Sequence, residues 1–252
     1  MRVLRTRSGL ALVRTLRAAD GERIRVLSQD GVFQSATYLG ERSFEPVFSY
    51  IRAFDRMFEA GPPVGRVLML GGGGFSYPKH LLVSREGVSI DVVEIDPAVV
   101  SAARRWFFVD ELLATPGLAA RLGTFCEDAR AYLERRPVGY DAIVNDTFSG
   151  REPVRALATV EAAQAARACL APGGLYLANV VSRSGGADVS FLRDQVATLL
   201  QAFAHVHVLL ASDDDLGGED NYLVVATDGD WEFPDAVPYD DSFLGKVLRD
   251  AG

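Results

Sequence analysis

The chain has 252 residues, 48% of them hydrophobic and 24% charged, which are ordinary proportions for a globular protein that can bury a sizeable core. Its net charge of −8 argues against a general nucleic-acid binder, because such proteins normally present a basic surface. No apolar run is long enough to span a membrane. From the charge we expect no nucleic-acid partner, and from the lack of such a run we expect no membrane partner.

The two cysteines, Cys126 and Cys169, lie inside apolar patterns and share no metal-type spacing with the three histidines. We expect both to be buried free thiols in a reducing compartment, and we expect no metal. The Arg-rich N-terminus resembles a targeting peptide, but Arg14 and Arg17 interrupt the apolar run that a secretory signal needs. The sequence therefore favours a cytoplasmic protein with a structured N-terminus.

Residues 1–40 predict a small antiparallel sheet. Tight turns at Asp20-Gly21 and Asp30-Gly31 separate segments with the character of strands. The three strands that we expect are 11–17, 23–27 and 32–38.

Apolar residues recur at helical spacing from Phe44 to Ala60, and Gly61-Pro62-Pro63 ends the pattern. We therefore expect a connecting helix and a domain boundary near residue 62. On this division, residues 1–61 form an N-terminal β-hairpin region with its connecting helix, and residues 62–252 form a nucleoside-binding α/β domain.

After residue 62 the pattern alternates between strand and helix, which indicates a parallel sheet covered on both faces. The last two strands have no helix between them and can pair antiparallel. The predicted fold class is α/β, a Rossmann-like seven-strand sheet of the class I methyltransferase type; a dinucleotide dehydrogenase would need a second mononucleotide-binding half. The expected strands are 66–70, 89–94, 122–127, 140–145, 174–181, 205–211 and 221–227, and the expected helices lie near 77–85, 97–108, 129–136, 158–171 and 188–203.

Glycines or an acid follow four successive strands, at the edge of the sheet where ligands bind. These are Gly71–Gly74, Glu94, Asp128 and Asp146. Glycines let a ligand approach the backbone closely, and an acid about 20 residues later suits the hydroxyls of a ribose. Each position also has a structural explanation as a tight turn, a solvated charge or a helix cap. Together they predict a nucleoside-containing cofactor.

Six stretches carry a more specific pattern, namely Asp30-Gly-Val-Phe-Gln34, Arg66–Gly73, Val93–Pro97, Glu127-Asp128-Ala129, Tyr140–Asp146 and Leu170–Leu175. They resemble motifs of the polyamine aminopropyltransferase family, the spermidine synthase-like proteins, and the similarity runs from about Asp30 to Thr227. The family also has a small β-region before its nucleotide-binding sheet, which a general methyltransferase would not be expected to carry. Its members usually form dimers, so the resemblance implies a homodimer.

The resemblance implies that the cofactor is decarboxylated S-adenosylmethionine and that a small-molecule amine is the acceptor. In the family, the amine displaces the donor's group in line at a carbon beside the sulfonium, and a carboxylate must hold and deprotonate that amine. Asp146 is the candidate catalytic residue. The candidate cofactor-binding residues are Gln34, Gly71, Gly72, Gly73, Glu94, Asp128, Ala129 and Asp146.

The chain departs from the family where polyamine charges would bind. Gly74 stands where the family keeps an acid that binds the donor's amino group, and Ser149 replaces a second acid that acts on the attacking amine. The family's Tyr-x-Glu appears as Phe44-Glu45-Pro46. A buried diamine without carboxylate partners is costly, so ordinary spermidine synthesis is not expected. Asp213–Asp215 offers replacement acids, although a solvated loop is the simpler interpretation.

Without the acid at Gly74, intact S-adenosylmethionine meets less repulsion of its carboxylate. Tyr77, Lys79 and Arg155 are then candidates for new contacts to that carboxylate.

We therefore expect a transferase that binds an adenosyl sulfonium donor, intact or decarboxylated, and passes a group to a small-molecule acceptor. A small-molecule methyltransferase of the same fold and a non-catalytic nucleoside-binding homologue are the alternatives. Glu94 and Asp128 argue against the non-catalytic homologue, because a protein that kept only a structural role would need no contacts to ribose and adenine. A NAD(P)-dependent reductase is the least favoured interpretation.

Overall fold

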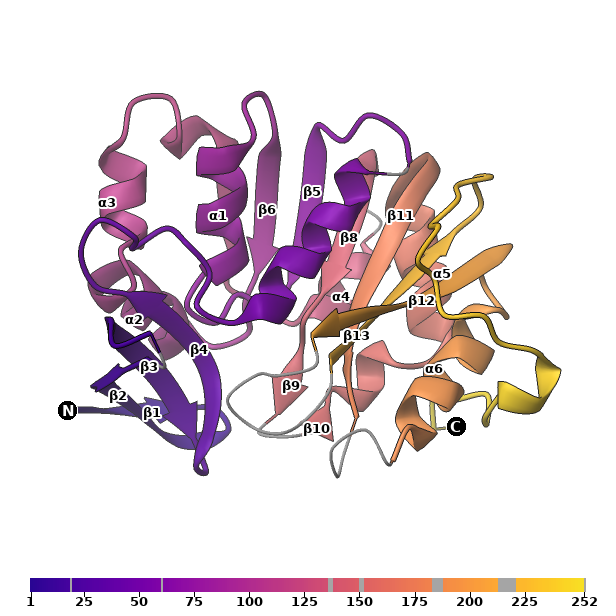
Figure 1. Cartoon of the computed structure of the whole chain (residues 1–252), viewed down its shortest axis with the longest axis horizontal. Helices are drawn as coiled ribbons and strands as arrows, with labels where there is room; N and C mark the ends of the chain where they lie inside the picture. The colour runs from indigo at the N-terminus through magenta and orange to yellow at the C-terminus, as the bar shows by residue number, and fades with distance from the viewer. Residues whose placement is uncertain are drawn as a thin grey trace.

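The computed structural model describes residues 1–18, 20–59, 61–135, 138–149, 152–182, 188–212 and 221–251, without the side chains of Ser149, Glu152 and Ser212. A small antiparallel sheet is followed by a larger sheet with helices on both faces (Figure 1). None of the helices in these ranges is both long and apolar enough to cross a membrane.

The N-terminal sheet has the strand order β1-β2-β3-β4, and every neighbouring pair is antiparallel. The three predicted strands are present as β2 (Gly9–Arg17), β3 (Arg23–Gln29) and β4 (Val32–Tyr38). β1 (Arg2–Thr6) is an additional edge strand that the pattern did not predict, because none of its residues is buried.

The connecting helix is shorter than predicted and is a 3-10 helix, η1 (Ser49–Phe58). The helix does not extend back to Phe44, because Pro46 disfavours a helical conformation of the residue before it. The buried residues Ile51, Phe54 and Met57 recur every third position, which matches the three residues per turn of a 3-10 helix.

The larger sheet has the predicted plan. Its order is β12-β13-β11-β8-β5-β6-β7; β13 is antiparallel to both neighbours and the other pairs are parallel. Its strands are β5 (Arg66–Leu70), β6 (Ser89–Val93), β7 (Leu122–Phe125), β8 (Tyr140–Asn145), β11 (Leu170–Val181), β12 (His205–Ser212) and β13 (Asn221–Thr227). The short strands β9 (Phe148–Ser149) and β10 (Glu152–Pro153) pair separately.

The helices in the described ranges are α1 (Ser76–Ser84), α2 (Pro97–Trp106), α3 (Val109–Ala114), α4 (Ala129–Glu134), α5 (Val160–Cys169) and α6 (Ser190–Leu199), with short 3-10 turns η2 (Ala119–Arg121), η3 (Arg155–Leu157) and η4 (Asp241–Phe243). The helix predicted over 97–108 ends early. Phe108 has a φ of 64°, in the left-handed region, and this turn separates α2 from α3.

Successive residues of the central strand β5 enter different cores. Val67 and Met69 pack with residues of α1 and η1, whereas Leu68 and Leu70 pack with residues of α4, α5 and α6. All four are at most 2% exposed. Burial on both faces explains why this strand reads as an unbroken apolar run.

Lys79 ties the two sheets together. Its buried Nζ donates to Thr37 Oγ1 (2.9 Å) and to the carbonyl oxygens of Ser43 and Phe107 (both 2.8 Å), so one side chain joins α1 to β4, to the turn after β4 and to the end of α2. Burial lowers the pKa of Lys79 to about 7. Ile24 and Val26 of the N-terminal sheet also share the apolar core on this face of β5.

The two cysteines differ in exposure. Both are free and Cys169 is buried, as predicted, but Cys126 is exposed. The prediction of a buried Cys126 is wrong because β7, which it follows, ends at Phe125 on the edge of the sheet, where none of the described strands covers it.

Candidate functional site

A cavity of about 380 Å³ lies at the carboxyl ends of β5, β6, β8 and β11. The N-terminal sheet and the start of η1 contribute to its wall. Among the predicted site residues, the lining includes Gln34, Gly71, Gly73, Glu94, Asp128, Ala129 and Asp146. The structure therefore brings seven of the eight candidates to one cavity, and the eighth, Gly72, does not line it.

The glycine loop follows β5 and has a backbone that needs glycine. Gly71 and Gly73 have φ angles of 88° and 49°, in the region that side chains disfavour. A Cβ at Gly71 would also collide with the main-chain oxygen of Asp146, and one at Gly72 would lie 2.9 Å from Phe75. The loop thus fits tightly against the neighbouring strand end.

The carboxylate of Glu94 holds this loop in place. Its Oε2 accepts the N–H groups of Gly72 and Gly73 (both 3.0 Å), and its Oε1 accepts the N–H of Asp96 (3.0 Å). Burial raises the pKa of Glu94, and these backbone hydrogen bonds oppose that rise. An ionised carboxylate offers about four acceptor positions, so one remains for a ligand hydroxyl. Gly72 contributes to the site through the hydrogen bond that its N–H donates to Glu94.

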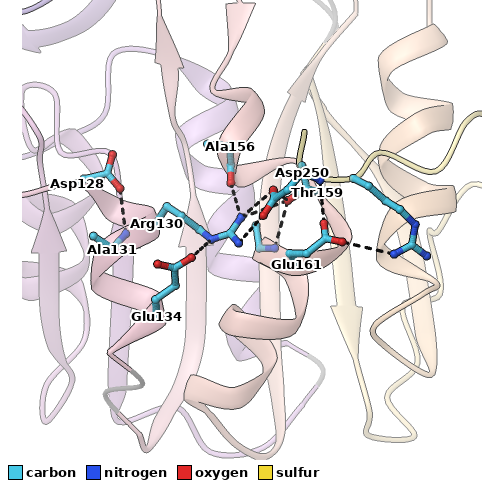
Figure 2. Close-up of polar contacts among 10 residues, drawn as sticks. Asp128, Arg130, Ala131, Glu134, Ala156, Thr159, Glu161 and Asp250 are labelled. Carbon is cyan, nitrogen blue, oxygen red and sulfur yellow. Dashed lines mark hydrogen bonds and ion pairs between the residues drawn. The ribbon is translucent and has the colours of Figure 1, made fainter. Parts of the chain in front are cut away.

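Asp128 lies at the edge of the cavity and caps α4, because its Oδ1 accepts the N–H of Ala131 at 2.9 Å (Figure 2). The next residue, Ala129, is 9% exposed and also lines the cavity. Arg130 then fastens α4 to the C-terminal segment through two hydrogen bonds to Asp250, at 3.1 and 2.8 Å. The helix that begins at Ala129 is therefore fastened to the C-terminal segment.

Asp146 is the polar centre of the other side of the cavity. Its Oδ1 accepts from Asn179 Nδ2 (2.9 Å), and its Oδ2 accepts from the hydroxyl of Tyr50 (3.5 Å). Burial raises the pKa of Asp146 to about 6, against the opposing effect of these two hydrogen bonds. Asn179 Oδ1 is buried and has no hydrogen-bond partner within the described part of the chain.

Asn179 and Tyr50 were missed by the sequence analysis. Asn179 is a polar residue inside the apolar run of β11, and that interruption was a usable signal. Tyr50 lies at the start of η1, and no local pattern relates it to the strand ends.

The residues proposed to contact a donor carboxylate do not reach the cavity. Tyr77 is fully buried and donates to Asp55 at 3.2 Å, while Lys79 is saturated by the contacts described above. Arg155 is exposed and does not line the cavity. The prediction that these three residues contact a donor carboxylate is wrong. They are close to the loops in sequence, but they do not line the cavity. Asp213–Asp215 and the side chain of Ser149 lie outside the described residues.

The space around Gly74 is filled by neighbouring side chains. A Cβ at Gly74 would lie 2.5 Å from Ser35 Oγ and 2.8 Å from Phe107 Cδ1. Ser35 is itself within hydrogen-bonding distance of Ser76 Oγ (3.1 Å), and Phe107 is fully buried. Ser35 and Phe107 therefore leave no room for a side chain at Gly74.

The cavity favours a positively charged ligand. Its charged lining residues in the described ranges are Glu94, Asp96, Asp128 and Asp146, and none of the described lining residues is lysine or arginine. Within the same ranges, no group of three histidine, cysteine or acidic residues could hold a metal ion.

Comparisons with known proteins agree with this geometry. A polyamine aminopropyltransferase of Vibrio vulnificus (strain CMCP6) is 30% identical over 170 residues, which cover 66% of this chain and 52% of that protein. A probable spermidine synthase from Corynebacterium glutamicum ATCC 13032 superposes with a TM-score of 0.71 at 25% identity, covering 90% of this chain and 80% of that one. No family model matches the chain.

A spermidine synthase in complex with the transition-state analogue AdoDATO has a TM-score of 0.67 at 20% identity and covers 86% of this chain and 74% of that one. This likeness shows the fold alone. The chain spans about half the length of the curated relatives that it matches.

The strand order with its antiparallel β13 and the cavity at the carboxyl edge define an α/β protein of the class I methyltransferase type. Within that class, the comparisons support a divergent member of the spermidine synthase-like family.

We predict that Gly74→Ala lowers the free energy of unfolding by about 1–3 kcal/mol, because the added methyl group overpacks the contact with Ser35 and Phe107. Gly65→Ala is the matched control: its Cβ would meet only Asp141, at 3.7 Å, so we expect a change within about 0.5 kcal/mol. Urea unfolding of both variants measures the difference, and equal effects would show that Gly74 has room for a side chain.

We predict that Asp146→Asn raises the melting temperature by about 2–6 °C at pH 8. The folded-state pKa of Asp146 lies above its usual value, so the folded protein binds more protons between about pH 4 and 6 and loses stability as the pH rises through that window. The gain should therefore vanish near pH 4. Asp241→Asn, at an exposed aspartate, is the control for calorimetry at both pH values. A gain that is the same at pH 4 and pH 8 would contradict the assignment.

Proposed function

We propose that the protein binds decarboxylated S-adenosylmethionine and transfers its aminopropyl group to an amine. The observation that carries the proposal is the carboxylate of Asp146, which lies on the same cavity as the glycine loop and Glu94 and has a raised pKa. A base of pKa about 6 can accept a proton near neutral pH while remaining mostly ionised.

The reaction follows from this arrangement. Asp146 holds the amine, whose lone pair forms a bond to the propyl carbon beside the sulfonium. The carbon–sulfur bond breaks, its electron pair returns to sulfur, and methylthioadenosine leaves as a neutral thioether. The amine's proton passes to the Asp146 carboxylate. Asn179 and Tyr50 orient that carboxylate by donating to its two oxygens.

The charges of the cavity support the decarboxylated donor over the intact one. Four acidic residues and no described basic residue line the cavity, which favours the sulfonium and the ammonium of the decarboxylated molecule. The carboxylate of intact S-adenosylmethionine would face these acids without a described cationic partner.

Calorimetric titration with the two donors tests the first step. We expect decarboxylated S-adenosylmethionine to bind at least about tenfold more tightly than the intact form, and methylthioadenosine to appear when an amine is added. Tighter binding of the intact donor with release of S-adenosylhomocysteine would instead establish a methyltransferase. Binding of methylthioadenosine without transfer to any amine would establish a non-catalytic nucleoside-binding protein.

The pH dependence of transfer tests Asp146. We predict that kcat/KM falls below about pH 6, where Asp146 becomes protonated. Asn179→Ala should shift this fall in kcat/KM to higher pH, because the Asn179 hydrogen bond favours the ionised carboxylate of Asp146. Asn221→Ala is the control, because Asn221 is also a buried asparagine on the cavity wall. This substitution should leave the pH at which kcat/KM falls unchanged. If kcat/KM falls at the same pH in the natural protein and in both variants, Asp146 is not the base.

A further inference from the structure

The cavity has two chemically different halves, and this inference about its acceptor rests on the proposed function. Glu94, Asp96 and Asp128 follow β6 and β7, whereas Asp146 follows β8 on the other side of β5. Neighbouring strands lie about 4.8 Å apart, so the ends of β6 and β8 are separated by about 10 Å. The acids of the adenosyl half are thus remote from the wall beyond Asp146, which we call the acceptor half.

Among the described lining residues, the acceptor half is apolar apart from Asp146 and uncharged amide and hydroxyl groups. Phe48 and Tyr50 stack with their ring centroids 6.1 Å apart and their planes inclined by 13°. Phe148, Val154 and Val181 complete the apolar wall. The asparagines Asn179 and Asn221 are 8% and 6% exposed and carry no charge.

This wall discriminates between amines by what lies at their far end. An amine that is held at Asp146 for transfer must place its remaining atoms along the aromatic and aliphatic surface. A second ammonium there would lose its water without a carboxylate partner among the described lining residues, which is strongly unfavourable. A methyl or phenyl group at the same position would instead gain from leaving water.

We propose that the acceptor is a monoamine with an apolar aliphatic or aromatic tail. Its nitrogen forms the new bond to the propyl carbon of the donor, the carbon–sulfur bond breaks, and the proton goes to Asp146. The product is an N-substituted 1,3-diaminopropane, with methylthioadenosine as the co-product.

Val181 is the position that should control this choice. It lies two residues after Asn179 on β11, so both side chains point to the same face of the strand, and both line the cavity. Val181→Glu would place a carboxylate on the apolar wall. Val83→Glu is the matched control, because Val83 is 47% exposed on α1 and does not line the cavity.

The test compares n-pentylamine with 1,4-diaminobutane, using decarboxylated S-adenosylmethionine as donor. The two amines have the same length and the same nucleophile, and differ only in a terminal methyl or ammonium group. We expect kcat/KM to favour pentylamine by at least about tenfold in the natural protein. Val181→Glu should reduce that ratio by about tenfold or more, and Val83→Glu should leave it unchanged.

A series from propylamine to hexylamine tests the apolar wall without any variant. We expect kcat/KM to rise about threefold for each added methylene. A ratio of one or less between pentylamine and diaminobutane, or a flat series, would overturn the monoamine proposal and leave aminopropyl transfer standing. Transfer to neither amine would overturn both proposals.

Discussion

The site depends on the buried carboxylate of Glu94, which accepts three backbone N–H groups. Two of them belong to the glycine loop after β5, and the third belongs to the start of the loop after β6. Because one charged group satisfies all three donors, the ends of two neighbouring strands are held in one arrangement. Gly71, Gly73 and Glu94 all line the cavity, so this arrangement shapes part of its wall.

A second constraint is the excess of negative charge in this cavity. Four acids and no described basic residue line the cavity. Burial separates the Asp146 carboxylate from water and raises its pKa, which expresses the cost of holding a charge there. A cationic ligand of the proposed kind would relieve that cost. The trade-off is common in enzymes, where groups that bind and react with a ligand reduce the stability of the empty fold. Lys79 compensates elsewhere by joining three segments behind the site.

Much of the fold could be predicted from local pattern. The apolar run of β5 predicted a central strand, because burial on both faces requires apolar residues at successive positions. The lack of a helical pattern between the last two predicted strands pointed to the antiparallel pair β12 and β13. The 3-10 form of η1 and the break at Phe108 were not predictable in this way. Both depend on the exact spacing at which a segment meets a core built by other parts of the chain.

The sequence by itself determined which residues stand at the strand ends, since strand direction and the two-residue period place Glu94 and Asp146 at one edge of the sheet. Only the tertiary structure decided that Asn179 and Tyr50 hold Asp146, that Ser35 and Phe107 fill the space at Gly74, and that Lys79 turns away from the cavity. These contacts join residues far apart in the chain. No local period encodes them, because they depend on how the N-terminal sheet and η1 pack against the larger sheet.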